Sequence, residues 1–484
     1  MKKIFLLLAL MTAVTVWAQM PSVTFGKTSK DLNYASMNSS QVVAETGEGL
    51  LVVVPGTRAM ILGATTTNDH IYLRMMDRDG KTLREVLLPG TEKNTVFGIS
   101  LPSPVAATLV DGRAYLAYRS HGKLLRTVVD PATMEVLSSG EVTDVNVGEM
   151  IHMTRTYSPN REYVAMEVAS TNSSQLILMD ETLQPLWVKN GGTYGWLRPD
   201  NQGNVYVGGT KVDQKGTHLT LTMHRTDGQI VEEKVDLPQM VDVQFLNADN
   251  GVMVAMGLVA FDEQNKKDRY TTFDRIAGFA FDFESRQAKV SMDNFTSDEL
   301  NNFANLSTKK PNKVGKADCL RVHRTLATTF GGVAVVDRTW QVTTRDMKTG
   351  ATYTDYYNMG TLVMAVDKEG RILWHVPFRN YTKEGLDEQV FSKAQLFEHD
   401  GKVFFLHVEP SLAPQYDIAK PASRFDPGKT HNKHGLYCID AQGRVEKCAL
   451  KLDGCTFGVP FRTSANSYVL FQGRSHGGLA TVQF

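Results

Sequence analysis

The 484-residue chain has few cysteines, no excess of charge of either sign and, beyond its N-terminus, no long apolar run. Lys and Arg number 52, and Asp and Glu also number 52. The basic field that nucleic-acid binding normally requires is therefore missing, and we expect no nucleic-acid partner. The charges are mixed along the chain, which also argues against a role at a membrane surface.

The four cysteines are Cys319, Cys438, Cys448 and Cys455. None has the CxxC or Cys/His spacing of a zinc site, so we expect no metal. Cys438 and Cys448 flank the turn at 440–443 and are expected to face each other across one hairpin, which makes them a possible disulfide in an exported protein. Cys455 is a rival partner for Cys448. The alternative is buried or loosely paired thiols without a catalytic role.

A signal peptide is expected at 1–18. Lys2 and Lys3 form its positive end, an apolar run follows, and Ala18 is a small residue suited to cleavage. The apolar run is shorter than the roughly 20 residues that a spanning helix needs, and no Cys follows it for attachment to lipid. We expect the mature chain, 19–484, to be periplasmic or secreted, with no integral membrane segment.

A strand–turn–strand pattern with Asp in the turn returns along the chain. The turn residues are Asp79, Asp130, Asp180, Asp227, Asp282, Asp367 and Asp440. The first four intervals are 51, 50, 47 and 55 residues, and the last two widen to 85 and 73. Self-similarity at this spacing, built from strands and turns, is the signature of a β-propeller. We predict an all-β fold, with a single propeller domain over 19–484.

Seven turns predict seven blades, and the strands left at the C-terminus predict an incomplete eighth. Apolar runs such as 205–208 and 362–366 fit the middle strands of blades, which are buried on both faces. The segment 21–45 precedes the first complete blade and is expected to supply the missing outer strand, which would close the ring. Seven blades are the alternative, if both terminal segments merge into the sheet of the Asp79 repeat.

Residues 364–374 read Met-Ala-Val-Asp-Lys-Glu-Gly-Arg-Ile-Leu-Trp and resemble the strand–Asp–Gly–strand–Trp repeat of quinoprotein-type (PQQ-like) propellers. Residues 178–187 are a weaker copy. Residues 199–210 resemble the Asp–Gly–Asn–(Ile/Val)–Tyr turn of bacterial propeller repeats. These likenesses imply the fold alone. A quinoprotein dehydrogenase needs adjacent cysteines at its cofactor, and because this chain has no adjacent pair, we expect neither that activity nor a cofactor.

Extra sequence is concentrated in four long loops. They are expected at about 260–275, 292–318, 337–360 and 409–434. In a propeller, the connections between second and third strands and those between blades leave the same face, so all four loops are expected on one face of repeats five to seven. Function commonly resides in such loops on a rigid scaffold. In the second loop, Thr296 or Ser297 is expected to cap a short helix, with Glu299 in its first turn.

We predict a ligand-binding surface on this loop-rich face. Its candidate residues are aromatic or basic: Trp340, Tyr353, Tyr356, Tyr357, Tyr416, Arg424 and Phe425. Exposed aromatic side chains beside acids, amides and Arg suit a glycan or an extended protein segment. The alternative is that these aromatics fold the long loops onto one another.

Motifs for known chemistries are missing. The sequence has no GxSxG elbow, HExxH helix or Walker loop, and the turn at 77–80 lacks the later ligands of an EF-hand. His431 and His434 lie in a loop flanked by Gly and Pro, which favours a solvated loop over a metal site. We expect an exported, non-catalytic propeller that binds a glycan or a protein partner. The competing interpretation is a carbohydrate-active enzyme, a glycoside hydrolase or polysaccharide lyase, with paired carboxylates at the channel mouth.

Overall fold

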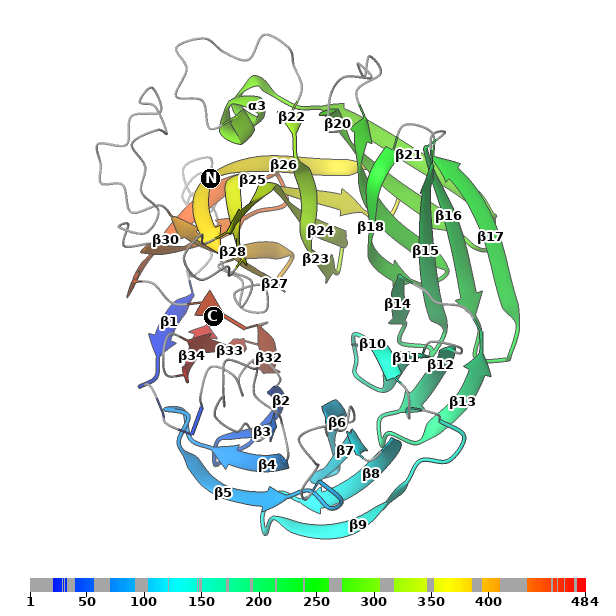
Figure 1. The fold of residues 1–484 in the computed structure, drawn as a ribbon, viewed down its shortest axis with the longest axis vertical. Coiled ribbons are helices and arrows are strands. Elements are labelled where there is room, and N and C mark those ends of the chain that lie inside the picture. The colour runs from blue at the N-terminus through cyan, green and yellow to red at the C-terminus, as the bar shows by residue number, and fades with distance from the viewer. Residues whose placement is uncertain are drawn as a thin grey trace, which may run out of the picture.

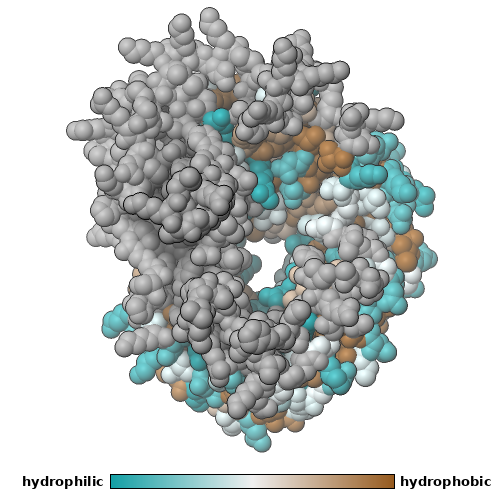
Figure 2. Space-filling view, in the orientation of Figure 1, coloured by the Kyte–Doolittle hydropathy of each residue, from teal (hydrophilic) through white to brown (hydrophobic). Residues whose placement is uncertain are grey.

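The computed structural model has eight antiparallel sheets arranged as blades around a central axis (Figure 1). It describes residues 21–27, 29, 31–32, 40–55, 70–91, 103–120, 122–145, 147, 150–170, 174–191, 195–213, 216–237, 240–260, 272–304, 317–345, 352–384, 394–409, 433–453, 456–458, 460–464, 466–473 and 477–484. An opening remains at the centre of the ring when the molecule is drawn space-filled (Figure 2). The predicted eight-bladed propeller is confirmed.

Each of the first seven blades runs along the chain from its inner to its outer strand. Blade 1 consists of β2 (Gln41–Glu45), β3 (Leu50–Pro55), β4 (Ile71–Met76) and β5 (Thr82–Leu87), and blade 2 consists of β6 (Ser103–Val110), β7 (Arg113–Ser120), β8 (Lys123–Asp130) and β9 (Glu135–Glu141). Blade 3 consists of β10 (Met150–Tyr157), β11 (Tyr163–Ser170), β12 (Ser174–Asp180) and β13 (Pro185–Asn190), and blade 4 consists of β14 (Trp196–Pro199), β15 (Val205–Asp213), β16 (Gly216–His224) and β17 (Ile230–Leu237). Blade 5 consists of β18 (Met240–Asp249), β19 (Val252–Ala260), β20 (Thr272–Asp282) and β21 (Gln287–Asn294), with β22 (Ala317–Asp318) added beside β20. Blade 6 consists of β23 (Leu320–Thr328), β24 (Gly331–Arg345), β25 (Thr352–Asp367) and β26 (Ile372–Glu384). Blade 7 consists of β27 (Gln395–His399), β28 (Lys402–Glu409), β29 (Lys433–Ile439) and β30 (Val445–Asp453).

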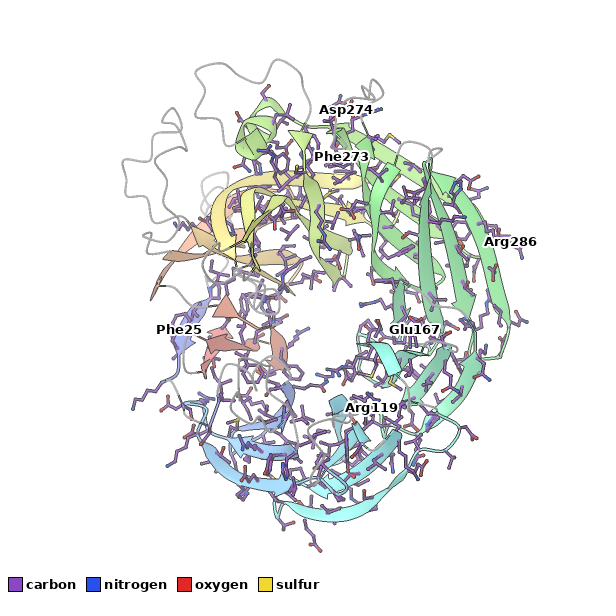
Figure 3. All side chains as sticks on the ribbon, in the orientation of Figure 1. Phe25, Arg119, Glu167, Phe273, Asp274 and Arg286 are labelled. Atoms are coloured by element: carbon purple, nitrogen blue, oxygen red, sulfur yellow. The ribbon has the colours of Figure 1, made fainter. Side chains whose placement is uncertain are left out.

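The eighth blade joins the two ends of the described chain. Its strands are β31 (Thr456–Phe457), β32 (Phe461–Ser464), β33 (Ser467–Gly473), β34 (Gly477–Gln483) and, outermost, β1 (Ser22–Phe25). The β1 strand pairs with β34 so that Val23 lies opposite Val482 and Phe25 opposite Ala480. Phe25 packs on the apolar cluster between blades 7 and 8 (Figure 3). The predicted closure by an N-terminal outer strand is confirmed.

Neighbouring blades pack face to face through one apolar cluster at each junction. The described residues form eight such clusters for eight blades, including one that joins blade 8 to blade 1. Middle strands contribute to the clusters on both sides, which explains why all six residues of β3 are buried. Outer strands alternate instead, as β17 does with its pattern of exposed and half-buried residues. The apolar runs of the sequence therefore mark the middle strands.

The repeating Asp makes the turn between the third and outer strands. In blade 6, Asp367 Oδ1 accepts hydrogen bonds from the amides of Glu369 (3.0 Å) and Arg371 (2.8 Å). Asp180 and Asp440 bond the amides two and four residues later in the same way. In blade 1 the equivalent residue is Asp77 rather than Asp79, because Asp77 Oδ1 accepts the bonds from positions 79 and 81. These side-chain bonds specify the turn locally.

The Trp of the quinoprotein-like repeat packs between blades. Trp374 on β26 is 7% exposed and belongs to the cluster between blades 6 and 7. The turn of blade 7 lies against it, and a Cβ added to Gly443 would lie 2.7 Å from Trp374 Cβ. The Trp therefore has a structural role in this blade.

Side chains from several blades also meet near the axis. The Tyr157 hydroxyl of blade 3 accepts bonds from Gln41 Nε2 of blade 1 (2.7 Å) and from the Ala107 amide of blade 2 (3.0 Å). The guanidinium of Arg161 lies 4.8 Å from the ring centroid of Tyr157 and 4.6 Å from that of Phe461 in blade 8. These contacts tie blade 3 to blades 8, 1 and 2.

The loop predicted at 337–360 is wrong as a loop, because most of it is strand. β24 and β25 continue past the body of blade 6 and pair as far as Arg345 opposite Thr352. The cause is composition: Thr, Val and Tyr residues fill this segment and favour extended backbone.

The signal peptide expected at 1–18 and the loop residues 261–271 and 410–432 lie outside the described residues. Within the described part, no helix has the length and hydropathy needed to cross a bilayer.

The tight packing of blade 4 on blade 5 gives a test of the fold. A Cβ added to Gly208 on β15 would lie 2.4 Å from the Phe245 ring, whereas one added to Gly209 would meet nothing nearer than 4.0 Å. We expect Gly208→Ala to lower the free energy of unfolding by about 1–3 kcal/mol through overpacking, as measured by urea denaturation. Gly209→Ala is the matched control and should leave the midpoint nearly unchanged. Equal effects would contradict the described packing.

Candidate functional site

The helix α3 (Ser297–Ala304) connects blade 5 to blade 6 (Figure 1). Thr296 is its N-cap, because the Glu299 amide donates to Thr296 Oγ1 at 3.3 Å. The Glu299 carboxylate in turn accepts from the Thr296 amide at 2.7 Å. This reciprocal pair is a capping box. The predicted short helix is confirmed, and of the two candidate caps the structure has Thr296.

Polar side chains fasten α3 to blade 6. Asn302 Nδ2 donates to the carbonyls of Thr361 (3.0 Å) and Phe378 (2.9 Å). Arg338 Nη1 donates to the Phe303 carbonyl at 3.0 Å, which supplies a cation to the C-terminal end of the helix. The helix is thus bonded to three different strands of blade 6.

The inner side of α3 completes the apolar cluster between blades 5 and 6. Leu300 and Phe303 are buried there, and the Phe303 ring meets Phe295 edge to face at 5.6 Å. Phe273 of β20 belongs to the same cluster and lies near the helix (Figure 3). Burial of these rings holds the helix down as part of the core.

A histidine between two carboxylates links α3 to both blades. His375 of β26 donates from Nδ1 to Glu299, which is 1% exposed, and its Nε2 lies 3.7 Å from Asp293 of β21. The hydrogen bond to Glu299 raises the pKa of His375 above its usual value, with the charges of Glu299 and Asp293 adding to the increase and burial opposing it. The imidazolium form therefore joins blade 5, α3 and blade 6.

Four of the predicted contact residues lie on the projecting strands of blade 6. Trp340 on β24 is paired with Tyr357 on β25, Tyr353 with Thr344, and Tyr356 with Gln341. Tyr416, Arg424 and Phe425 lie outside the described residues. The register brings Trp340 and Tyr357 together, which their separation in the sequence did not reveal.

The predicted hairpin register of the cysteines is wrong by two residues. Cys438 lies opposite Glu446, and Cys448 opposite Leu436. Cys438 and Cys448 are therefore diagonal neighbours, and such neighbours have Cα atoms about 7–8 Å apart, beyond the usual span of a disulfide. The Cys448 side chain is not among those described, so the disulfide itself stays a prediction.

Sequence reasoning identified the helix of this site but missed its partners. The capping box was visible as Thr-x-x-Glu, whereas His375, Asp293 and Asn302 gave no local signal because their partners are distant in the sequence. Among the described residues, no group of three His, Cys, Asp or Glu side chains has a geometry that could hold a metal ion.

Comparison with known proteins assigns no family to the chain. No family model matches it, and no curated protein matches it. The Dos1 propeller matches with a TM-score of 0.47 and 10% identity, over 95% of each chain. The dihydro-heme d1 dehydrogenase NirN, solved in complex with DHE, has a TM-score of 0.41 and 10% identity, over 92% of this chain and 76% of that one. Hydrazine synthase of Kuenenia stuttgartiensis has a TM-score of 0.32 and 9% identity, over 86% and 97%. These similarities concern the fold alone.

His375 with its two carboxylate partners, Glu299 and Asp293, is called the His375 clamp below. Because this clamp depends on the imidazolium form, we expect α3 to be held more weakly at high pH. Because the pKa of His375 is raised above its unfolded value of 6.5, the clamp contributes fully below that value and is lost as pH rises through the folded pKa. We expect the hydrogen-exchange protection of residues 297–304, corrected for intrinsic rates, to fall over this range.

His375→Gln is the matched control, since it keeps a donor but cannot titrate. It should remove the pH dependence. Glu299→Ala should lower α3 protection by about 1–3 kcal/mol at pH 6, because it removes both the capping box and the partner of the imidazolium. A pH dependence identical in the wild type and His375→Gln would rule out the clamp.

Proposed function

We propose that this protein is an exported, non-catalytic β-propeller that binds a glycan or a protein partner through the face over blades 5 to 7. The observation that carries the proposal is the unequal build of the ring. β24, β25 and β26 have 15, 16 and 13 residues, while the strands of blade 3 have 6 to 8. Elements added to one side of a repeating scaffold are a usual place for recognition.

Residue types on the projecting strands support binding. Trp340 lies opposite Tyr357, and Tyr353 and Tyr356 lie on the same strand as Tyr357. Tyr and Trp are enriched at interfaces because they combine a large apolar area with a polar group. The helix α3 is packed and bonded to the same blade, so this side of the ring is rigidly supported. A rigid platform loses less entropy on binding than a mobile one.

Export is supported by the N-terminal sequence. Lys2 and Lys3, the apolar run after them and Ala18 have the order of a secretory signal. Retention of residues 1–18 in the mature protein, measured by mass spectrometry, would overturn this part of the proposal.

A carbohydrate-active enzyme is the competing function, and it needs two carboxylates facing each other across a substrate site. The buried carboxylates described on this face have structural partners instead. Glu299 bonds His375 and the helix cap, and Asp337 accepts a bond from the Thr361 hydroxyl at 2.5 Å. Turnover of a polysaccharide panel by the purified protein would establish the competing function.

The aromatic positions of β25 provide the direct test of binding. We expect the double substitution Tyr356→Ala with Tyr357→Ala to weaken binding at least about ten-fold, which corresponds to roughly 1.4 kcal/mol. Binding would be measured by glycan array and by affinity capture from the cell envelope of the producing organism. Leu83→Ala, at a residue 48% exposed on blade 1, is the surface control. Binding unchanged by the double substitution would remove this site.

A further inference from the structure

The outer strands of blades 2 and 3 lie across the ring from blade 6 (Figure 1). A cleft opens between these two strands. Its cavity volume is about 750 Å³, within the range of ligand-binding clefts. One wall consists of residues 138–144, from β9 and its extension, together with Arg126 of the neighbouring strand β8, and the other wall consists of residues 184–188 at the start of β13. The cleft therefore runs along two strands.

Small residues on β9 cause the cleft. A bulge shifts the pairing of β8 with β9 so that Val128 lies opposite Ser138 and Arg126 opposite Gly140. Ser138 and Gly140 do not fill the space beside blade 3, and a Cβ added to Gly140 would meet nothing within 4 Å. The junction of blades 4 and 5 differs, because its outer strand β17 carries the larger residues Val231 and Val235, which pack against the apolar cluster of that junction.

Arg126 gives the first wall a cation, while Glu141 and Asp144 of the same wall carry carboxylates. Its Nε donates to the Thr182 carbonyl at 2.7 Å, and its Cζ lies 5.1 Å from the Tyr115 ring centroid. Among the described residues it forms no ion pair, whereas Glu141 of the same wall is paired with Lys123 at 2.6 Å. A half-buried guanidinium of this kind suits a carboxylate ligand.

The opposite wall is mainly apolar, with Gln184 at one end. It includes Pro185, Leu186 and Val188, and Leu186 is 51% exposed. Trp187 also borders the cleft, but its ring packs on His224 at 5.7 Å and on Lys189 at 4.9 Å, on the side of blade 4. The wall therefore offers apolar contact to a side chain rather than a ring face to a sugar.

We propose that this cleft binds an extended peptide segment of a protein partner, with an aliphatic side chain against Leu186 and Val188 and an Asp or Glu side chain on Arg126. β9 and β13 are the outermost strands of their sheets, so their outer backbone edges are placed to pair with an added strand. The acidic residue of the peptide is inferred from charge complementarity to Arg126, and the aliphatic residue is inferred from the apolar contact that Leu186 and Val188 offer. This surface is independent of the one on blades 5 to 7.

A displayed library of 12-residue random peptides, selected on the mature full-length protein, tests the proposal. Selected peptides should combine an acidic residue with an aliphatic one. Their affinity should fall at least ten-fold with Gly140→Phe, which fills the cleft, and with Arg126→Met, which removes the cation but keeps the stem. Gly140→Ala is the matched control and should bind as the wild type does, as should the double substitution at Tyr356 and Tyr357.

Three results would overturn the proposal. They are the absence of any selected peptide, selected peptides that bind Gly140→Phe and Arg126→Met as tightly as the wild type, and glycan-array binding that Gly140→Phe abolishes. The last result would assign the cleft to carbohydrate. Melting temperatures of the two variants would be compared with that of the wild type, and Arg126→Met alone decides the outcome if Gly140→Phe does not fold.

Discussion

Face-to-face burial of neighbouring sheets is the constraint on which this structure depends. Each blade has two apolar faces, and in the described part of the chain each face packs on the neighbouring blade through one cluster at the junction. No blade can therefore bury its core alone, and the ring must close. β1 completes the outer edge of the last sheet, and its Val23 and Phe25 pack on the cluster between blades 7 and 8. Closure is thus a condition of stability for all eight blades, in the way that stacked repeats stabilise one another.

The same constraint decides where the chain can vary. Residues at the junctions are fixed by packing, as Gly208 shows with Phe245 against it. Additional sequence must either leave the sheets at the ends of their strands or lengthen the strands beyond the junction. β24 and β25 are lengthened in this way. α3 is accommodated only because it adds its own apolar face to a junction, through Leu300 and Phe303. The site elements are therefore continuations of the core rather than attachments to it.

Local signals in the sequence predict most of this fold, and long-range contacts account for what they miss. The turn Asp bonds amides two and four residues away, so the repeat is visible without a structure. The capping box of α3 is equally local. In contrast, His375 and Glu299 are 76 residues apart, and nothing near either residue indicates the other. The loop predicted at 337–360 failed because extra length was interpreted as loop, although its Thr, Val and Tyr content favours strands.

The two proposed surfaces arise from opposite changes to one repeating unit. On blade 6 the strands are lengthened and a helix is added, which creates a platform without disturbing the junctions. On blade 2 the outer strand carries the small residues Ser138 and Gly140 at positions where larger side chains would fill the space beside blade 3, and a cleft results. Because the inner and middle strands bury most of each junction, the outer strand can lose contacts there at little cost to stability. A missing side chain is harder to recognise in a sequence than an added segment, since Ser and Gly are ordinary in exposed strands and turns. The cleft therefore becomes visible only once the neighbouring blade and the guanidinium of Arg126 are in place.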